Sequence, residues 1–191
     1  MVVPRTGAVA SGGMLRSGTI AGERRAVGVS ARIPPGRGQE SAWDYPRPPR
    51  VDPSARHIAV MFGGVAVADT REAMRLLETA NPPVYYIPPQ HVRLELMTLN
   101  ARHTQSETLG RATYYDLALD GRVVRNAAWV YTDPLPGYEA LRGRIAFHAG
   151  RVDEAFVDGE RVTPQPGSFG GGWITSDVVG PFKGEPGSWD W

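Results

Sequence analysis

The sequence predicts a mainly β domain of short antiparallel strands with one α-helix at about residues 70–80. Three observations lead to this prediction. The apolar runs are short and are separated by turn residues. Asp-Gly, the dipeptide preferred in two-residue hairpin turns, occurs at 120–121 and at 158–159 between strand-like runs. Only one segment repeats its apolar residues at a helical period. Many short strands with one helix are typical of the mainly β class.

Composition limits the type of protein. The chain has 191 residues, 41% hydrophobic and 21% charged, which suits one water-soluble globular domain with a tail. Zero cysteines exclude disulfides and thiolate metal sites. A net charge of +1 gives no global basic patch for nucleic acid, and no apolar run approaches the roughly 18 residues of a membrane span. We therefore expect a cytoplasmic protein with neither nucleic acid nor membrane as its partner.

The first 42 residues differ from the rest. They contain Gly, Ser, Pro and six arginines against only Glu23 and Glu40, without apolar periodicity. This composition predicts a disordered or extended N-terminal segment at 1–42, and a transit peptide is the alternative that an Arg- and Ser-containing start leaves open. The folded domain is expected at 43–191. Its first stretch, 45–54, should be extended because four prolines restrict the backbone there.

The next segments predict a hairpin and then the helix. Residues 58–62 and 65–67 have strand composition, and Gly63-Gly64 separates them. Asp69 precedes Glu72 by three residues, the spacing of a capping box, and Asn81-Pro82 can end a helix. The helix predicted between them would place four apolar side chains on one face, namely Ala73, Leu76, Leu77 and Ala80.

The central hairpin allows its register to be predicted. Residues 114–119 and 123–130 should be strands on either side of Asp120-Gly121. A two-residue loop there sets the partners. The expected pairs are Leu117 with Val124, Tyr115 with Asn126, and Asp116 with Arg125.

Further strands are expected in the last third of the chain. Residues 144–148 and 151–157 should form a strand pair, and Asp158-Gly159 predicts a second hairpin with 160–162. The C-terminal aromatics alternate with Gly and Pro, which predicts an irregular strap that fills apolar hollows. These aromatics are Trp173, Phe182, Trp189 and Trp191.

Several motifs resemble those of the DUF427 family, which occurs in bacteria and fungi. The segments that carry the resemblance are Asn126-Ala127-Ala128-Trp129, Leu141-Arg142-Gly143-Arg144-Ile145-Ala146-Phe147, Arg151-Val152-Asp153, Val157-Asp158-Gly159-Glu160 and Gly171-Gly172-Trp173-Ile174-Thr175. The resemblance spans roughly 43–191 and implies a small β-tent-like (Mss4-like) or barrel-like domain. It also implies a Cys and a Lys in the loop expected at 103–111. This chain has Ser106 and Leu109 there, so any thiol or amine chemistry of the family is in doubt.

Motifs for cofactor or metal chemistry are missing from the sequence. A nucleotidyltransferase would need a Gly-Ser turn with nearby paired aspartates, and no Asp-x-Asp occurs. Walker A and Gly-x-Gly-x-x-Gly patterns are absent as well. The four histidines are scattered singly, without the spacing of a metal site. We therefore expect no cofactor and no metal.

Two sets of residues are candidates for a site. His103 lies near Ser106 and Glu107 in the polar loop, where an imidazole could transfer protons, although a solvated loop histidine is the simpler interpretation. Aromatic residues on predicted strands could line a groove that binds a small molecule, or could be ordinary core. This second set is Tyr86, Tyr115, Trp129 and Tyr131, with Asn126 as a polar residue opposite Tyr115.

Two classes of function remain. The first is an enzyme or small-molecule-binding protein, for example in specialised metabolism, with the aromatic groove as its site. The second is a noncatalytic interaction or structural module. The altered loop at Ser106 and Leu109 favours the second class, or a new acid/base role for His103 and Glu107.

Overall fold

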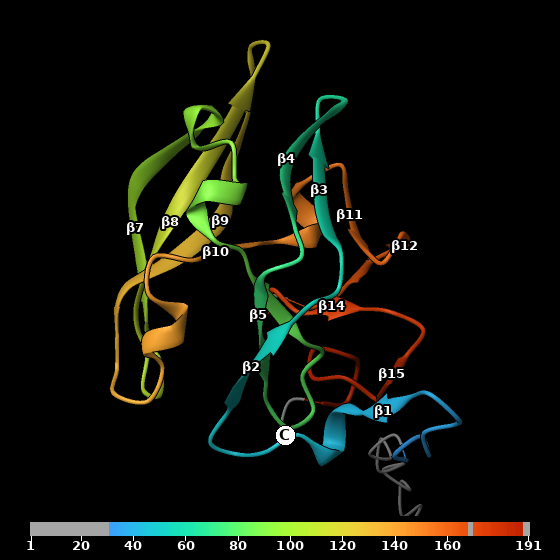
Figure 1. The fold of residues 1–191 in the computed structure, drawn as a ribbon. Helices are drawn as coiled ribbons and strands as arrows, with labels where there is room; N and C mark the ends of the chain where they lie inside the picture. Colours follow the sequence, from blue (N-terminus) through green and yellow to red (C-terminus); the bar gives the residue numbers. More distant parts are fainter. Residues whose placement is uncertain (1–30, 168–169, 189–191) are drawn as a thin grey trace, which may run out of the picture.

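The computed structural model describes residues 31–167 and 170–188, which fold mainly as β-strands (Figure 1). The mainly β prediction is confirmed. The strands form several separate sheets, and none of these closes into a barrel within the described residues. The helical segments among these residues are five short 3-10 turns, at Ala42–Asp44, Pro89–His91, Leu94–Leu96, Glu139–Leu141 and Ala149–Arg151. None of them has the length and apolar character that crossing a membrane requires.

One four-stranded antiparallel sheet has the order β10-β9-β8-β7. Its strands are β7 (Met97–Ser106), β8 (Gly110–Leu119), β9 (Arg122–Pro134) and β10 (Ile145–Phe147). In Figure 1 the long β7, β8 and β9 form a tall ribbon on one side of the molecule. Because side chains alternate along a strand, this ribbon has two faces with different neighbours.

A second four-stranded sheet stands beside that ribbon in Figure 1. Its order is β12-β11-β3-β4, and all its pairs are antiparallel. The strands are β3 (Ile58–Phe62), β4 (Val65–Thr70), β11 (Glu154–Val157) and β12 (Glu160–Arg161). The hairpins predicted at Gly63-Gly64 and Asp158-Gly159 are both confirmed here.

Smaller sheets complete the domain. Strands β2 (Arg50–Ser54), β5 (Ala73–Leu77) and β6 (Val84–Tyr86) form a three-stranded antiparallel sheet. Two further strand pairs are short. They are β1 (Glu40–Ser41) with β15 (Val178–Val179), which is parallel, and β13 (Thr163–Pro164) with β14 (Trp173–Ile174), which is antiparallel.

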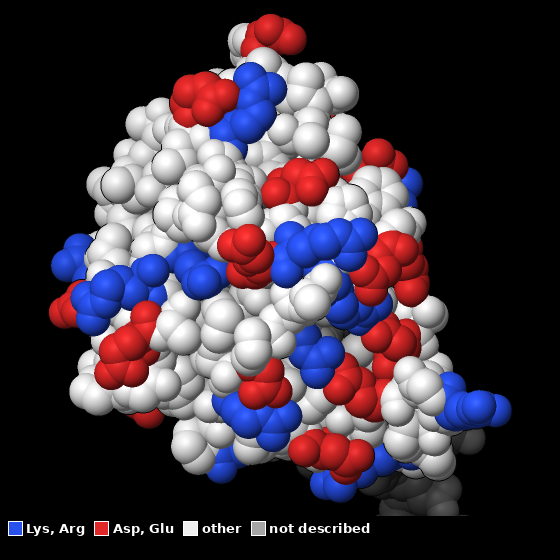
Figure 2. Space-filling model, viewed as in Figure 1, with Lys and Arg blue, Asp and Glu red and all other residues white. Residues whose placement is uncertain are grey.

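The buried apolar residues form a main core and a second cluster. The main core holds Phe62, Tyr85, Leu117, Phe147 and Trp173 among others. The second cluster lies against the other face of β8 and β9 and includes Tyr86, Trp129 and Tyr131. Basic and acidic side chains are interspersed on the face drawn in Figure 2.

The predicted helix at 70–80 is wrong, since β4 continues to Thr70 and β5 occupies Ala73–Leu77. Asp69 does not cap a helix there; its carboxylate lies 2.9 Å from His57 Nε2. Strand β5 is the central strand of its sheet and pairs with β2 and β6 on its two sides. These ladders satisfy the backbone along both edges, so tertiary pairing outweighs the local helical pattern.

The central hairpin follows the predicted register only near its turn. Leu117 pairs with Val124 as predicted, but Tyr115 pairs with Ala128 because the strand bulges at Asn126. Asn126 has a φ of 52°, a left-handed conformation that Asn tolerates better than most residues. The expected contact of Asp116 with Arg125 is present as an ion pair at 3.1 Å.

Two other expectations need correction. The segments predicted as one strand pair, 144–148 and 151–157, separate: β10 pairs with β9, and β11 pairs with β3 and β12. A 3-10 turn at Ala149–Arg151 redirects the chain between the two sheets. The long polar loop expected at 103–111 is a hairpin, because β7 reaches Ser106 and β8 starts at Gly110.

A disordered or extended segment was predicted at 1–42. Residues 1–30 of this segment lie outside the described part of the chain. Closer to the domain, Glu40 accepts two hydrogen bonds from Arg75, at 2.7 and 2.8 Å. Strand β1 thus attaches the start of the folded chain to β5 as well as to β15. The boundary at residue 42 stays a prediction.

Deleting residues 184–191 is expected to lower the melting temperature, as the strap prediction requires. Trp173 is fully buried and Phe182 is 6% exposed, whereas Trp189 and Trp191 lie outside the described residues. Glu185 accepts a hydrogen bond from Phe182 N at 2.9 Å, and Ser188 Oγ accepts one from Gly184 N at 2.8 Å. The deletion removes this turn and uncovers Phe182. An unchanged melting temperature in thermal unfolding by circular dichroism would contradict the structural role.

Candidate functional site

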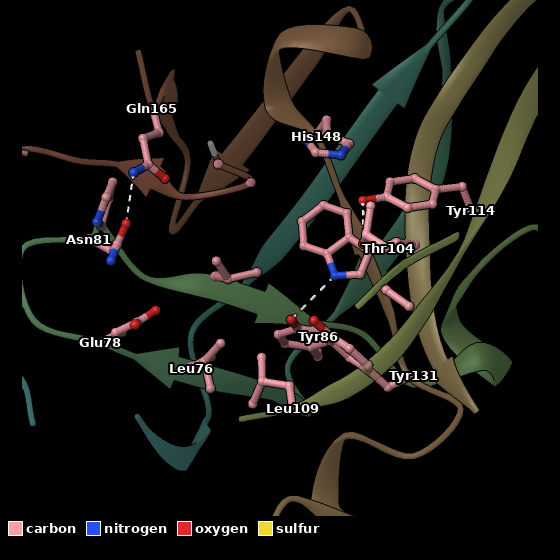
Figure 3. A pocket seen from close by; sticks show the side chains of 16 residues that line it. Leu76, Glu78, Asn81, Tyr86, Thr104, Leu109, Tyr114, Tyr131, His148 and Gln165 are labelled. Carbon is pink, nitrogen blue, oxygen red and sulfur yellow. Dashed lines mark hydrogen bonds between the residues drawn. The ribbon is translucent and has the colours of Figure 1, made fainter. Parts of the chain in front are cut away.

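A cavity of about 210 Å³ opens between the β6, β8 and β9 strands and the segment before β14 (Figure 3). We call it the aromatic cavity. Its walls include the aromatic residues Tyr86, Tyr114, Trp129, Tyr131 and His148. The remaining wall consists of Leu76, Glu78, Asn81, Pro82, Val84, Thr104, Leu109, Ala112, Gln165, Gly170 and Gly171.

Strand alternation brings these rings together. Trp129 and Tyr131 are two residues apart on β9 and therefore share a face. Across the ladder, Trp129 pairs with Tyr114 and Tyr131 pairs with Ala112, so β8 offers one ring and one small side chain to the same face. Tyr86, at the end of β6, closes the cavity from the neighbouring sheet.

The rings hold one another in fixed orientations. The Tyr86 and Trp129 rings meet edge to face, with centroids 6.1 Å apart, and Trp129 Nε1 donates a hydrogen bond of 3.3 Å to the Tyr86 hydroxyl. Tyr131 lies 6.2 Å from Tyr86. Burial raises the pKa of Tyr86 well above its usual value, and burial with the nearby Tyr114 and Glu78 raises the pKa of Tyr131 to about 12. Both phenols are therefore neutral at physiological pH.

His148 is the titratable ring of the cavity wall. Its ring is parallel to that of Tyr114, with the centroids 6.3 Å apart, and its centroid lies 4.5 Å from that of the Trp129 ring. Burial and the positive charge of Arg151 lower its pKa to about 4, with a smaller contribution from Arg102, against the opposing effect of a hydrogen bond with the Gly170 backbone. The imidazole is therefore uncharged at neutral pH and can both donate and accept a hydrogen bond.

Polar side chains occupy the end of the cavity away from Tyr114 in Figure 3. Gln165 is 7% exposed, and its Nε2 donates to Asn81 Oδ1 at 3.0 Å. Its Oε1 accepts a hydrogen bond from Gly172 N at 3.1 Å. The carboxylate of Glu78 also lines this end, while Thr104 and the Tyr114 hydroxyl, 3.1 Å apart, lie at the other. Polar groups thus flank an aromatic centre at two ends.

Gly171 lies directly against the Trp129 indole. A Cβ atom at this position would come within 1.8 Å of Trp129 Cη2, so any side chain would have to displace the ring. The glycine therefore sets the depth at which the backbone covers the indole.

The structure brings three of the five predicted groove residues to the cavity, namely Tyr86, Trp129 and Tyr131. Tyr115 lies on the other face of β8, where it packs against the main core. Asn126 occupies the bulge in β9, and its Oδ1 accepts a hydrogen bond from Asn100 Nδ2 at 3.0 Å. These two side chains are not part of the cavity wall.

The three residues predicted for proton transfer lie along the β7–β8 hairpin, outside the cavity wall. His103 is exposed on β7, and Glu107 is exposed in the turn. Ser106 Oγ accepts hydrogen bonds from the backbone of Thr108 and Leu109, at 3.3 and 3.1 Å, and so stabilises the turn. Their catalytic assignment stays a prediction. Leu109 is 7% exposed and lines the cavity.

Sequence reasoning missed His148, Tyr114 and Gln165 as members of the wall. A signal for His148 existed in the pairing of β10 with β9. Ala146 lies opposite Trp129, so a residue two positions later points to the same side. The strand pair expected for 144–148 was a different one, and this relation was therefore hidden.

Within residues 31–167 and 170–188, no group of three or more His, Asp or Glu side chains is placed to hold a metal ion. No curated protein matches the sequence. A family model described as a domain of unknown function, DUF427, matches residues 50–158. The matched stretch contains Tyr86, Trp129, Tyr131 and His148, whereas Gln165 and Gly171 follow it. Because the match covers more than half of the chain, this protein belongs to the DUF427 family.

Proposed function

We propose that the domain is a small-molecule-binding protein whose ligand places a flat, largely apolar group in the aromatic cavity. The observation that carries this proposal is the open cavity beside five aromatic rings. Ligand sites are concave, mostly apolar and equipped with a few polar groups that orient the ligand. The aromatic cavity is concave and lined by aromatic rings, with Asn81, Gln165 and Thr104 as neutral polar groups and the Glu78 carboxylate at one end.

The size of the cavity limits the ligand. An engineered apolar cavity of about 150 Å³ holds one benzene molecule. The aromatic cavity is about 210 Å³, so one ring with a short substituent fits. A ligand ring packed against Tyr86, Trp129 or Tyr131 would gain edge-to-face or stacking contacts, which are worth about 0.5–1.5 kcal/mol each beyond the area buried.

Binding is better supported than catalysis by these side chains. Activated nucleophiles need an adjacent base or a lowered pKa. The described wall offers the hydroxyls of Thr104 and the tyrosines, the Glu78 carboxylate and the His148 imidazole, and the pKa values of Tyr86 and Tyr131 are raised rather than lowered. The neutral His148 imidazole can orient a ligand through a hydrogen bond without a change of charge.

A purely structural role is the second candidate, because three of the rings are also members of the second apolar cluster. Tyr86 is 1% exposed, and Trp129 and Tyr131 are each 7% exposed. Residues buried to this extent stabilise the fold whether or not a ligand binds. The two candidates differ in their response to ring-bearing probes.

Trp129→Ala is expected to weaken binding of a neutral ring probe by about 1–3 kcal/mol, because the indole forms a wall of the cavity. We would titrate 2-phenylethanol and indole by isothermal calorimetry and follow backbone amide shifts by NMR. Trp129→Phe keeps a ring in place and serves if the alanine variant fails to fold.

Tyr115→Phe is the matched control, since Tyr115 lies on the same strand as Tyr114 but faces the main core. It should leave probe affinity unchanged. If no neutral ring probe binds, or if both variants lose affinity equally, the cavity is not the site and the structural role holds.

A further inference from the structure

A second cavity adjoins the aromatic cavity at His148. Its volume is about 340 Å³, and it shares His148, Gln165 and Gly170 with the first. Arg102 and Arg151 line it, together with backbone around Gly172. We call it the basic cavity. Because the two cavities share these wall residues, they are direct neighbours.

The basic cavity carries positive charge without compensation among the residues described. Its described wall contains two arginines and no Asp or Glu. Eight arginines of the described chain form ion pairs with carboxylates, and Arg102 and Arg151 are not among them. Two guanidinium groups that share a cavity and lack a carboxylate can accept an anion from outside.

Local contacts hold both guanidinium groups near the junction. Arg102 Cζ lies 5.2 Å from the centroid of the Tyr114 ring, and Tyr114 belongs to the aromatic cavity. Arg151 Nη1 donates a hydrogen bond of 3.0 Å to the Arg125 carbonyl. A guanidinium has five N–H donors, so this bond leaves others for a ligand.

We propose that the basic cavity binds the anionic group of the molecule whose ring lies in the aromatic cavity, with Arg102 and Arg151 as its partners. The ligand class is thus an aromatic acid, in which a ring carries a carboxylate or a phosphate on a short arm. This inference rests on the proposed function, because it assigns the second half of the same ligand.

His148 supplies an independent readout for the anion. It lies at the junction, and the positive charges of Arg151 and Arg102 contribute to its lowered pKa. An anion between the two arginines would offset that charge and raise the pKa of His148. The imidazole therefore reports occupation of the basic cavity even when the aromatic cavity is empty.

The first test compares ligands that share a ring and differ in charge. Phenylacetate is expected to bind the full chain about tenfold more tightly than 2-phenylethanol at low ionic strength, because charge-assisted hydrogen bonds are stronger than neutral ones. The gap should shrink at high salt, since exposed charges are screened. Phenethylamine should bind no better than the alcohol. Comparing phenyl phosphate with phenylacetate shows whether phosphate or carboxylate is the preferred anionic group.

The variant Arg102→Gln/Arg151→Gln should abolish the advantage of phenylacetate, so that the acid and 2-phenylethanol bind this variant equally well. Arg111→Gln is the matched control, because Arg111 is exposed on β8 and is not part of either described wall. Equal affinities of acid and alcohol for the wild type would overturn the anion inference and leave the aromatic cavity as the binding site.

The second test uses inorganic phosphate alone and does not depend on any ring. Phosphate should raise the pKa of His148, measured from its imidazole NMR signals, in the wild type and not in the double variant. If no ring probe binds, the proposed function fails, and this titration still decides the anion inference. An unchanged His148 pKa in the presence of phosphate would overturn it.

Discussion

Replacing Trp173 with alanine is expected to lower the free energy of unfolding by about 3–5 kcal/mol, the usual cost of removing a large buried aromatic side chain. Trp173 is fully buried in the main core, and its ring lies 5.4 Å from that of Tyr85. Its Nε1 donates a hydrogen bond of 3.0 Å to the Phe147 carbonyl. The variant therefore loses packing between the C-terminal strap and β10 and leaves a buried carbonyl unpaired. Urea unfolding followed by circular dichroism measures the effect.

Two further variants distinguish the loss of buried packing at Trp173 from the effect that any substitution has on stability. Trp173→Phe keeps a ring and removes the hydrogen bond, so it should cost less, about 1–2 kcal/mol. Leu99→Ala removes a side chain that is 51% exposed on β7 and should change little. A loss below 1 kcal/mol for Trp173→Ala would contradict the buried position of the strap.

Acidification should destabilise the protein through His148 by an amount on the order of 3 kcal/mol between pH 6.5 and about 4. Burial and the charges of Arg151 and Arg102 lower the folded-state pKa to about 4, whereas an unfolded imidazole titrates near 6.5. Between these values the unfolded state binds the proton more readily than the folded state. The stabilisation is therefore complete above pH 6.5 and is lost as the pH falls toward 4.

The measurement is the difference in unfolding free energy between the wild type and His148→Gln at several pH values. Carboxylates such as Asp116 and Asp158, whose pKa values are lowered in the fold, also contribute to acid sensitivity, and the difference cancels them. The wild type should lose its relative stability as the pH falls. Parallel curves for wild type and His148→Gln would contradict the buried, uncharged imidazole.

The sequence predicted those parts of the fold that local chemistry determines. Glycine and Asp-Gly turns identified the hairpins at 63–64, 120–121 and 158–159 because these dipeptides favour the required backbone angles. The helix prediction at 70–80 was wrong because long-range pairing, not local chemistry, determines the structure of this segment. Its apolar spacing fits a helix, but ladders from β2 and β6 pair with it from distant positions.

The candidate site was predictable only as far as strand alternation reaches. Alternation placed Trp129 and Tyr131 on one face of β9. It failed for Tyr115, because the bulge at Asn126 shifts the pairing and β8 turns Tyr114 to the cavity instead. Gln165 and Gly171 belong to the wall because they contact residues far away in the sequence, Asn81 and Trp129. No short sequence motif predicts such contacts.

The pairing of β1 with β15 has a consequence for synthesis of the chain. Glu40 pairs with Val178, and Gln39 Nε2 donates to the Ser176 carbonyl across 137 residues. A ribosome releases residue 40 long before residue 178, so β1 has no partner strand during most of translation. Long-range contacts also form slowly because the closing loop is large. Local hairpins such as β8–β9 can fold while the chain grows, and β1 can pair with β15 only after residues 178–179 have been made.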